Sequence, residues 1–153
     1  MLKRNDRIKE IRILSMNKES EFKGRIIEEV QQSLFRDDLP NRKNCAFRYR
    51  KYGLKAEKGA LILFQYDNHI IAVAKFDGKE NFPAPDKKGY GGELYLKCNS
   101  IAIFEPITSD EIKKIWTGFK GFSHVKYRLS SNKYPLLWDL LRRKKIKYAH
   151  ELW

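Results

Sequence analysis

The spacing of apolar residues changes several times along the chain, and each change marks an expected element. An isoleucine-rich stretch predicts a strand over residues 8–16. Apolar residues then recur at helical spacing, which predicts a helix over 21–35 with Ser20 as its N-cap. We expect that helix to end before Pro40, because proline cannot continue it.

From residue 44 the period becomes two, as in a strand with one face in water. On this pattern Arg48 and Arg50 share one face, while Phe47 and Tyr49 share the other.

The most strand-like part of the chain follows, in two apolar runs at 60–66 and 70–76. The short polar segment between them, with Asp67-Asn68 at its tip, predicts a β-hairpin. Residues 77–92 are rich in Gly, Pro, Lys and Asp, which predicts a loop.

The rest of the chain continues as strands and then helices. We expect strands at 93–98 and 101–106, with Pro106 ending the second, and a helix over 109–116 that begins with a Thr108–Glu111 capping box. The remaining expected elements are an aromatic loop at 118–124, a short strand at 125–129 and a helix over 133–144, capped by Ser131 or Asn132, whose Leu136, Leu137, Leu140 and Leu141 face the core.

This order predicts an α+β fold: a curved, mainly antiparallel sheet of five to six strands, or a small β-barrel, flanked by about three helices. The βαβ alternation of a parallel sheet does not occur. We expect one domain over 1–153, with flexible ends at 1–6 and 146–153.

Two segments carry a family resemblance. The run at 57–76 resembles the central hairpin of the PUA-like superfamily, which includes the EVE, ASCH, YTH and SRA-type domains, and the run at 101–112 resembles the strand-then-helix step that follows it. The chain is also similar to reader domains of modification-dependent HNH restriction endonucleases. The resemblance implies a PUA-like fold and a reader of a nucleic-acid base, modified or not, associated with restriction, defence or RNA processing.

The net charge of the sequence points to a class of partner without reference to the family resemblance. The sequence has 32 Lys and Arg against 19 Asp and Glu, a formal net charge of +13. Such an excess opposes compaction, and a polyanion relieves it because bound phosphates release counterions. We therefore predict DNA or RNA as the partner; a basic surface that serves solubility is the alternative.

The remaining composition favours no cofactor or metal. Cys45 and Cys98 lie far apart in sequence, which suggests unpaired thiols in a reducing compartment, and the three histidines show no ligand spacing. The charged N-terminus has no signal-peptide core and no run is long enough to span a membrane, so we predict a cytoplasmic protein.

The first candidate binding segment is 42–58, where basic residues alternate with aromatic ones. Guanidinium groups fork onto phosphates or guanine, and exposed rings stack on bases. The candidates here are Arg48, Tyr49, Arg50, Lys51 and Tyr52. Alternatively, the aromatic residues belong to the core and the arginines to a solvated face.

The second candidate is the glycine-punctuated loop at 116–126, which has the composition of a loop that closes over a flipped base. Its candidates are Phe119, Lys120, Phe122, Ser123 and Lys126, and Tyr66 of the hairpin completes the predicted pocket between hairpin and loop. Alternatively, both phenylalanines pack in the core. The basic run at 142–147 extends the last helix into a cationic arm, and Lys87 and Lys88 offer further phosphate contacts.

No nuclease, ATPase or hydrolase motif is visible, so catalysis is not predicted. The prediction is a non-catalytic nucleic-acid-binding domain, with a nuclease domain or subunit as a further partner. The alternative is a basic protein-interaction factor, phage- or defence-associated, that acts on a protein or nucleoprotein. The oligomeric state stays open.

Overall fold

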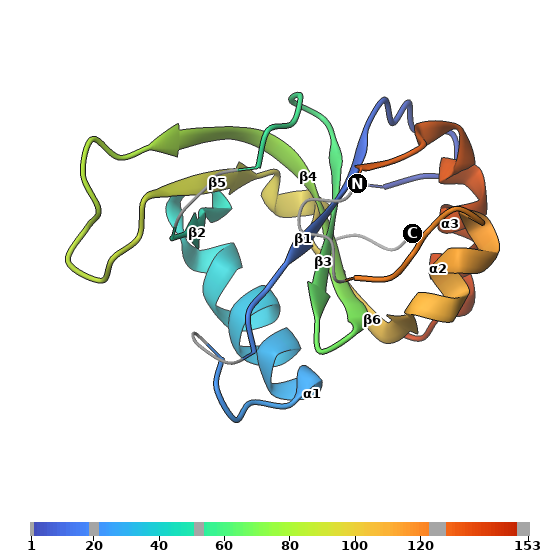
Figure 1. Cartoon of the computed structure of the whole chain (residues 1–153), viewed down its shortest axis with the longest axis horizontal. Coiled ribbons are helices and arrows are strands. Elements are labelled where there is room, and N and C mark those ends of the chain that lie inside the picture. The colour runs from blue at the N-terminus through green and yellow to red at the C-terminus, as the bar shows by residue number, and fades with distance from the viewer. Residues whose placement is uncertain (1, 19–21, 51–53, 123–127, 150–153) are drawn as a thin grey trace.

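The computed structural model describes residues 2–18, 22–50, 54–122 and 128–149 (Figure 1). Across these ranges it has an α+β fold with an open eight-stranded sheet. The strands are β1 (Ile11–Ser15), β2 (Phe47–Tyr49), β3 (Leu61–Tyr66), β4 (His69–Asn81), β5 (Gly92–Leu96), β6 (Ala102–Thr108), β7 (Arg128–Leu129) and β8 (Ile146–Ala149).

The helical segments lie on both sides of the sheet, with α1 opposite α2 and α3 (Figure 1). They are α1 (Ile27–Val30), the π-helix η1 (Gln31–Asp38) that continues it, α2 (Ser109–Ile115), α3 (Tyr134–Arg143) and the short 3-10 turns η2 (Leu39–Asn41), η3 (Lys43–Cys45), η4 (Cys98–Ser100) and η5 (Ser131–Lys133). The helix predicted over 21–35 therefore begins only at Ile27, and from Gln31 it is a π-helix rather than an α-helix. Its proposed cap, Ser20, falls outside the described residues.

The long strand β4 organises the sheet. Its first half pairs with β3 on one side and β6 on the other, and its second half pairs with β5. The β3–β4 hairpin is confirmed, and its tip residues Asp67 and Asn68 both have positive φ (49° and 61°), as a type I′ turn requires.

The sheet runs β2-β5-β4-β3-β1-β7, with β6 beside β4 and β8 beside β6. Among the described strands, β1 pairs in parallel with β3 and the other pairs are antiparallel, so the predicted mainly antiparallel sheet is confirmed. Strand β8 was not expected, because residues 146–153 were predicted to be a flexible end; in the structure Ile146–Ala149 pairs with β6.

Two hydrophobic cores lie on the two faces of the sheet, and β3 contributes to both. Ile62, Phe64 and Tyr66 pack toward η1, β2 and β5. Leu61 and Leu63 pack on the other face, toward α2 and α3. The six residues of β3 are all buried, which explains why its sequence is continuously apolar.

Gln31, at the start of η1, ties the helical segment to the sheet. It is fully buried, and its amide nitrogen donates to the carbonyl oxygens of Ile71 (2.9 Å) and Phe104 (2.8 Å). Both carbonyls lie where the β4–β6 register shifts, so the ladder bonds are interrupted there. Lys147 of β8 donates to the Gln31 amide oxygen (3.0 Å).

Several predicted boundaries differ from the structure. The expected loop at 77–92 is shorter, because β4 continues to Asn81 and β5 begins at Gly92. Pro106 does not end β6; it lies where the pairing with β4 shifts, a place that tolerates proline. The basic run at 142–147 does not extend α3, since the helix ends at Arg143 and β8 begins at Ile146.

Smaller elements also differ. The capping box of α2 is present, with Thr108 and Glu111 bonded reciprocally. The N-terminus of α3 has no side-chain cap from Ser131 or Asn132, and Leu136 is 49% exposed rather than in the core. Residues 2–6, expected to be flexible, include the buried Leu2 and an Asp6–Lys75 ion pair (3.2 Å).

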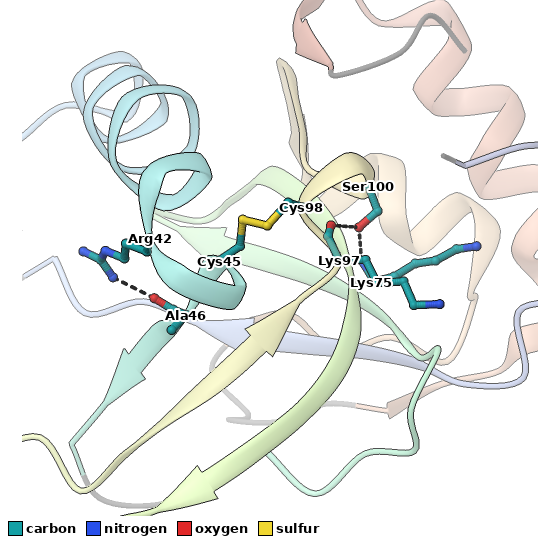
Figure 2. The surroundings of a disulfide bond; sticks show 7 residues. All are labelled: Arg42, Cys45, Ala46, Lys75, Lys97, Cys98 and Ser100. Carbon is teal, nitrogen blue, oxygen red and sulfur yellow. Dashed lines mark hydrogen bonds between the residues drawn. A yellow bond between two sulfur atoms is a disulfide. The ribbon is translucent and has the colours of Figure 1, made fainter.

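Cys45 and Cys98 form a disulfide, with their Cα atoms 5.6 Å apart (Figure 2). This corrects the expectation of unpaired thiols. The pairing escaped sequence analysis because the cysteines are 53 positions apart, with two strands and a hairpin between them whose path cannot be inferred from spacing. A reducing, cytoplasmic location stays a prediction.

No helix among the described residues is long and apolar enough to cross a membrane.

Candidate nucleic-acid interface

A cavity of about 210 Å³ lies between η1, β2 and the loop 82–91. We call it the basic cavity; its walls are Phe22, Arg25, Ser33, Leu34, Asp38, Arg42, Phe47, Arg48, Lys88 and Tyr90. Four of these residues are cationic and one is acidic, so the lining is strongly positive. A small cavity with this charge suits one anionic group and a flat ring better than a bulky apolar ligand.

The arginines of the basic cavity are held by neighbouring side chains. Arg42 binds Asp38 with two hydrogen bonds, Nε to Oδ1 at 3.1 Å and Nη2 to Oδ2 at 2.5 Å. Arg48 lies 3.8 Å from the Glu93 carboxylate. Such contacts orient guanidinium groups before a ligand arrives, which lowers the entropy lost on binding.

Strand β2 positions Arg48 by its alternation. Phe47 and Tyr49 are buried and Arg48 points to solvent between them, as the period of two predicted. Phe47 packs against Phe64 of β3, with ring centroids 5.3 Å apart.

The loop 82–91 is shaped by Asp86. One oxygen of its carboxylate accepts hydrogen bonds from the backbone N–H groups of Lys88 and Tyr90, both at 2.9 Å. The bonds from the backbone, that of Tyr90 above all, and the nearby Arg48 charge lower the pKa of Asp86 despite the opposing effect of desolvation. Asp86 thereby presents Lys88 and Tyr90 to the basic cavity.

Arg50 supports the same loop. Its guanidinium lies over the Tyr90 ring at 4.7 Å from the centroid and donates to the Lys88 carbonyl at 2.8 Å. It comes so close to Gly89 that a Cβ there would lie 3.0 Å from the Arg50 Nη1 atom. Arg50 thus contacts two cavity residues from outside the lining.

Tyr49 was a predicted stacking residue, but the structure places its ring in the core, 8% exposed. Its hydroxyl donates to the Glu80 carbonyl (3.1 Å) and also contacts the Asn81 amide oxygen. Burial, with a smaller contribution from Glu93, raises the Tyr49 pKa. Tyr49 therefore fixes the base of the 82–91 loop, and the alternative interpretation of its ring as a core residue matches this placement.

Tyr66 is fully buried. Its hydroxyl donates to the backbone carbonyls of Phe22 (3.0 Å) and Arg25 (2.7 Å), at the entry to α1. Burial raises the Tyr66 pKa. This tyrosine holds the segment that carries Arg25 to the basic cavity.

The aromatic loop lies on the other face of the sheet. Phe119 and Phe122 pack against each other, with centroids 5.1 Å apart, and are 2% and 9% exposed; Lys120 between them is exposed. The structure therefore does not bring these rings together with Tyr66 around a pocket between hairpin and loop. Lys51, Tyr52, Ser123 and Lys126 lie outside the described residues.

A second depression, of about 500 Å³, lies beside that loop, and we call it the apolar groove. Trp116, Phe119 and the half-exposed Leu136 contribute apolar surface, and Lys114, Arg128 and Lys133 contribute charge.

Sequence reasoning did not assign Arg25, Arg42 and Tyr90 to a site. Arg42 was part of the candidate segment 42–58 but was not chosen as a site residue, and Lys88 was predicted to contact phosphates without being assigned to a pocket. A usable signal was present in the Asp86-Lys-Lys-Gly-Tyr90 run, because an aspartate followed by glycine predicts a turn that projects the residues between them.

Comparison with known proteins supports the fold. No protein-family model matches the sequence, and no curated protein does either. A solved structure of ASCH from Zymomonas mobilis matches 88% of this chain and 96% of its own, with a TM-score of 0.51 and 12% identity. A crystal structure of a mutant of the same protein matches 86% and 96%, with a TM-score of 0.54 and 13% identity.

These structures are ASCH domains, a branch of the PUA-like superfamily, so the predicted PUA-like fold is confirmed. At 12–13% identity the likeness concerns the fold. Among the described residues, no group of three or more His, Cys, Asp or Glu side chains could hold a metal ion.

Proposed function

We propose that this chain is a non-catalytic nucleic-acid-binding module that holds one nucleotide of a DNA or RNA strand in the basic cavity. The observation that carries the proposal is the lining itself: Arg25, Arg42, Arg48 and Lys88 face one carboxylate, with Tyr90 at the edge. Phosphates attract such a set of cations, and guanidinium groups bind them bidentately.

The base of that nucleotide would lie against Tyr90 and Phe22. Both rings are partly exposed and line the basic cavity. Arg50 lies over the Tyr90 ring and stabilises its orientation. A ring that is held in place and open to solvent is a stacking platform for any base. The volume of about 210 Å³ favours a single extruded or unpaired base over a duplex.

The proposal keeps the predicted reader role but moves its pocket. The base-reading surface is the basic cavity rather than a pocket beside the aromatic loop. Discrimination of a modified base would come from the cavity walls, where Ser33 and Asp38 offer hydrogen-bonding groups next to the ring-sized space.

The test is fluorescence anisotropy with short single- and double-stranded DNA and RNA, with and without methylated or hydroxymethylated cytosine, at two salt concentrations. We expect a single strand or a modified duplex to bind selectively. Tyr90→Ala should weaken that binding by about 1–3 kcal/mol, as for loss of one base stack. Arg48→Ala should weaken binding and reduce its salt dependence.

The control is Lys113→Ala, which removes one exposed charge from α2 on the opposite side of the sheet. It should leave selectivity unchanged. Weak binding to every oligonucleotide that disappears at the higher salt, with Tyr90→Ala equal to the wild type, would contradict the proposal. The basic protein-interaction factor would then be the better explanation.

A further inference from the structure

One half of the disulfide belongs to the chain segment that also contributes residues to the wall of the basic cavity. Cys45 is fully buried and belongs to the turn η3, between the cavity residues Arg42 and Arg48. Its partner Cys98 is exposed and begins the turn η4 after β5 (Figure 2). A single covalent bond thus joins the segment that carries two cavity arginines to a different part of the sheet.

The Cys98 end of this bond is anchored firmly. The Ser100 hydroxyl accepts a hydrogen bond from the Lys75 backbone N–H of β4 (2.7 Å) and donates to the Lys97 carbonyl (2.6 Å). Figure 2 shows both bonds beside the disulfide. The turn η4 is therefore attached to the central strand, and through the disulfide it holds η3 in place.

At the Cys45 end, the disulfide helps to maintain an unusual backbone conformation. Asn44 and Cys45 both have positive φ, 57° and 45°, a conformation that costs free energy in residues other than glycine. Other contacts at this turn are the hydrogen bond from the Arg42 guanidinium to the Ala46 carbonyl (2.9 Å), that from the Cys45 N–H to the Arg42 carbonyl (3.0 Å), the packing of Cys45 in the core, and the three-residue pairing of β2 with β5. Reduction removes the covalent constraint on this turn, and we expect its backbone then to relax toward ordinary φ values.

Arg42 links the turn to the ligand site, because it lines the basic cavity and also bonds Asp38 and Ala46. A change of backbone at Asn44 and Cys45 alters the distance from Arg42 to Ala46 and, through β2, the direction of Arg48. We propose that the Cys45–Cys98 disulfide controls the basic cavity, so that the oxidised chain binds nucleic acid tightly and the reduced chain binds it weakly. This inference rests on the proposed function of the cavity.

The chemistry is thiol–disulfide exchange with a small dithiol. A thiolate of the dithiol attacks the sulfur of the exposed Cys98, the bond between Cys98 and Cys45 breaks, and Cys45 leaves as a thiolate that takes up a proton. The second thiol of the reductant, once deprotonated, attacks the reductant's other sulfur, the one now bonded to Cys98. Cys98 leaves as a thiolate and takes up a proton. Two thiols form in the chain, and the dithiol is oxidised to a disulfide.

The first experiment measures the cavity wall without any ligand. Hydrogen exchange of a peptide that covers 42–49 is compared in oxidised and dithiol-treated protein, with a peptide over 61–73 of the central hairpin as the internal control. We expect faster exchange at 42–49 on reduction and no change in the hairpin. Unchanged exchange at 42–49 would overturn the inference whatever the binding data show.

The second experiment measures anisotropy of the oligonucleotide that the wild type binds best, before and after dithiol treatment. The reduced chain should bind about fivefold more weakly or worse. Cys98→Ser, which lies outside the cavity wall, should bind like the reduced wild type and should not respond to dithiol. A melting curve checks that each form is folded at the assay temperature.

The possible failures are distinguishable. Equal binding by oxidised, reduced and Cys98→Ser protein would overturn redox control and leave the proposed function standing. No binding by any form would overturn the proposed function, and the inference with it. If reduction unfolds the chain, the assay is repeated with Cys45→Ala/Cys98→Ser at lower temperature, where tight binding by the folded variant would overturn the inference.

Discussion

The two sides of the sheet each have a depression rimmed by cationic residues, yet they are built differently. The basic cavity is small and its charged groups are held: Arg42 by Asp38, Arg48 by Glu93, and the Lys88 loop by Asp86. The apolar groove is wider, with Trp116 and Leu136 contributing apolar surface beside its cations.

The comparison shows that the number of positive charges does not identify a binding site here. What distinguishes the basic cavity is positioning, because its charged groups are oriented by neighbouring side chains and the backbone segments that carry them are bonded to the buried Tyr49 and Tyr66. A preoriented site loses less conformational entropy on binding than a set of free lysines. The predictions below test this difference.

The largest expected effect comes from Gln31→Leu, in η1, on the face of the sheet that carries the basic cavity. Leucine fills a similar volume but leaves the Ile71 and Phe104 carbonyls and Lys147 without their partner, so the free energy of unfolding should fall by about 2–4 kcal/mol. Urea denaturation measures it. The matched change on the other side is Leu136→Ser, which should alter stability by less than about 0.5 kcal/mol because Leu136 is half exposed. Similar losses in both would contradict the assignment of Gln31.

Gly92→Ala should come next. A Cβ at this position would collide with the Tyr49 ring and with the Glu80 backbone, which cannot move without breaking the β4–β5 pairing. Overpacking of this kind costs about 1–3 kcal/mol and should displace the 82–91 loop. We expect a lower urea midpoint and weaker oligonucleotide binding together. Gly118→Ala, where a Cβ meets nothing within 4 Å, is the control on the groove side.

A pair of charge reversals compares the two depressions directly. Lys88→Glu and Lys133→Glu change the net charge equally, one in the basic cavity and one in the apolar groove. Lys88→Glu should weaken oligonucleotide binding by about tenfold, since it removes a positioned phosphate contact. Lys133→Glu should have a much smaller effect that salt abolishes. Equal effects would mean that overall charge, not the cavity, governs binding.

The smallest effect concerns acid pH. Asp86 has a lowered pKa in the folded chain, so its hydrogen bonds stabilise the loop above the ordinary value of 3.8 and are lost as the pH falls through the folded pKa. The amide NMR signals of Lys88 and Tyr90 should therefore shift with a midpoint below 3.8. A midpoint at or above that value would show that Asp86 does not organise the loop. Asp86→Ala should remove the transition.

The sequence was most informative where structure is local. The β3–β4 hairpin, the capping box of α2 and the alternation of β2 depend on residues within a few positions of one another, and all three are confirmed. The exposure of Arg48 followed from that alternation. Local patterns cannot show which strand pairs with which, so the parallel β1–β3 pair and the β6–β8 pair were missed.

The candidate site was harder to predict because its residues come from three separate segments. Arg25 precedes α1 and Arg42 follows η2, and Lys88 with Tyr90 belongs to a loop that had to fold on Asp86 to reach them. The aromatic residues gave a misleading signal, since a ring beside a lysine has the same sequence pattern whether it stacks on a base or packs inward. Phe119 and Phe122 pack inward.

The position of β8 bears on how the chain folds as it is synthesised. Strand β6 pairs with β4 along one edge and with β8 along the other, and β8 is synthesised about forty residues after β6. Until Ile146–Ala149 has left the ribosome, the backbone groups along that edge of β6 have no ladder partner, and Gln31 lacks Lys147. The nascent chain thus exposes an apolar strand edge, open to pairing with another chain, until β8 has emerged.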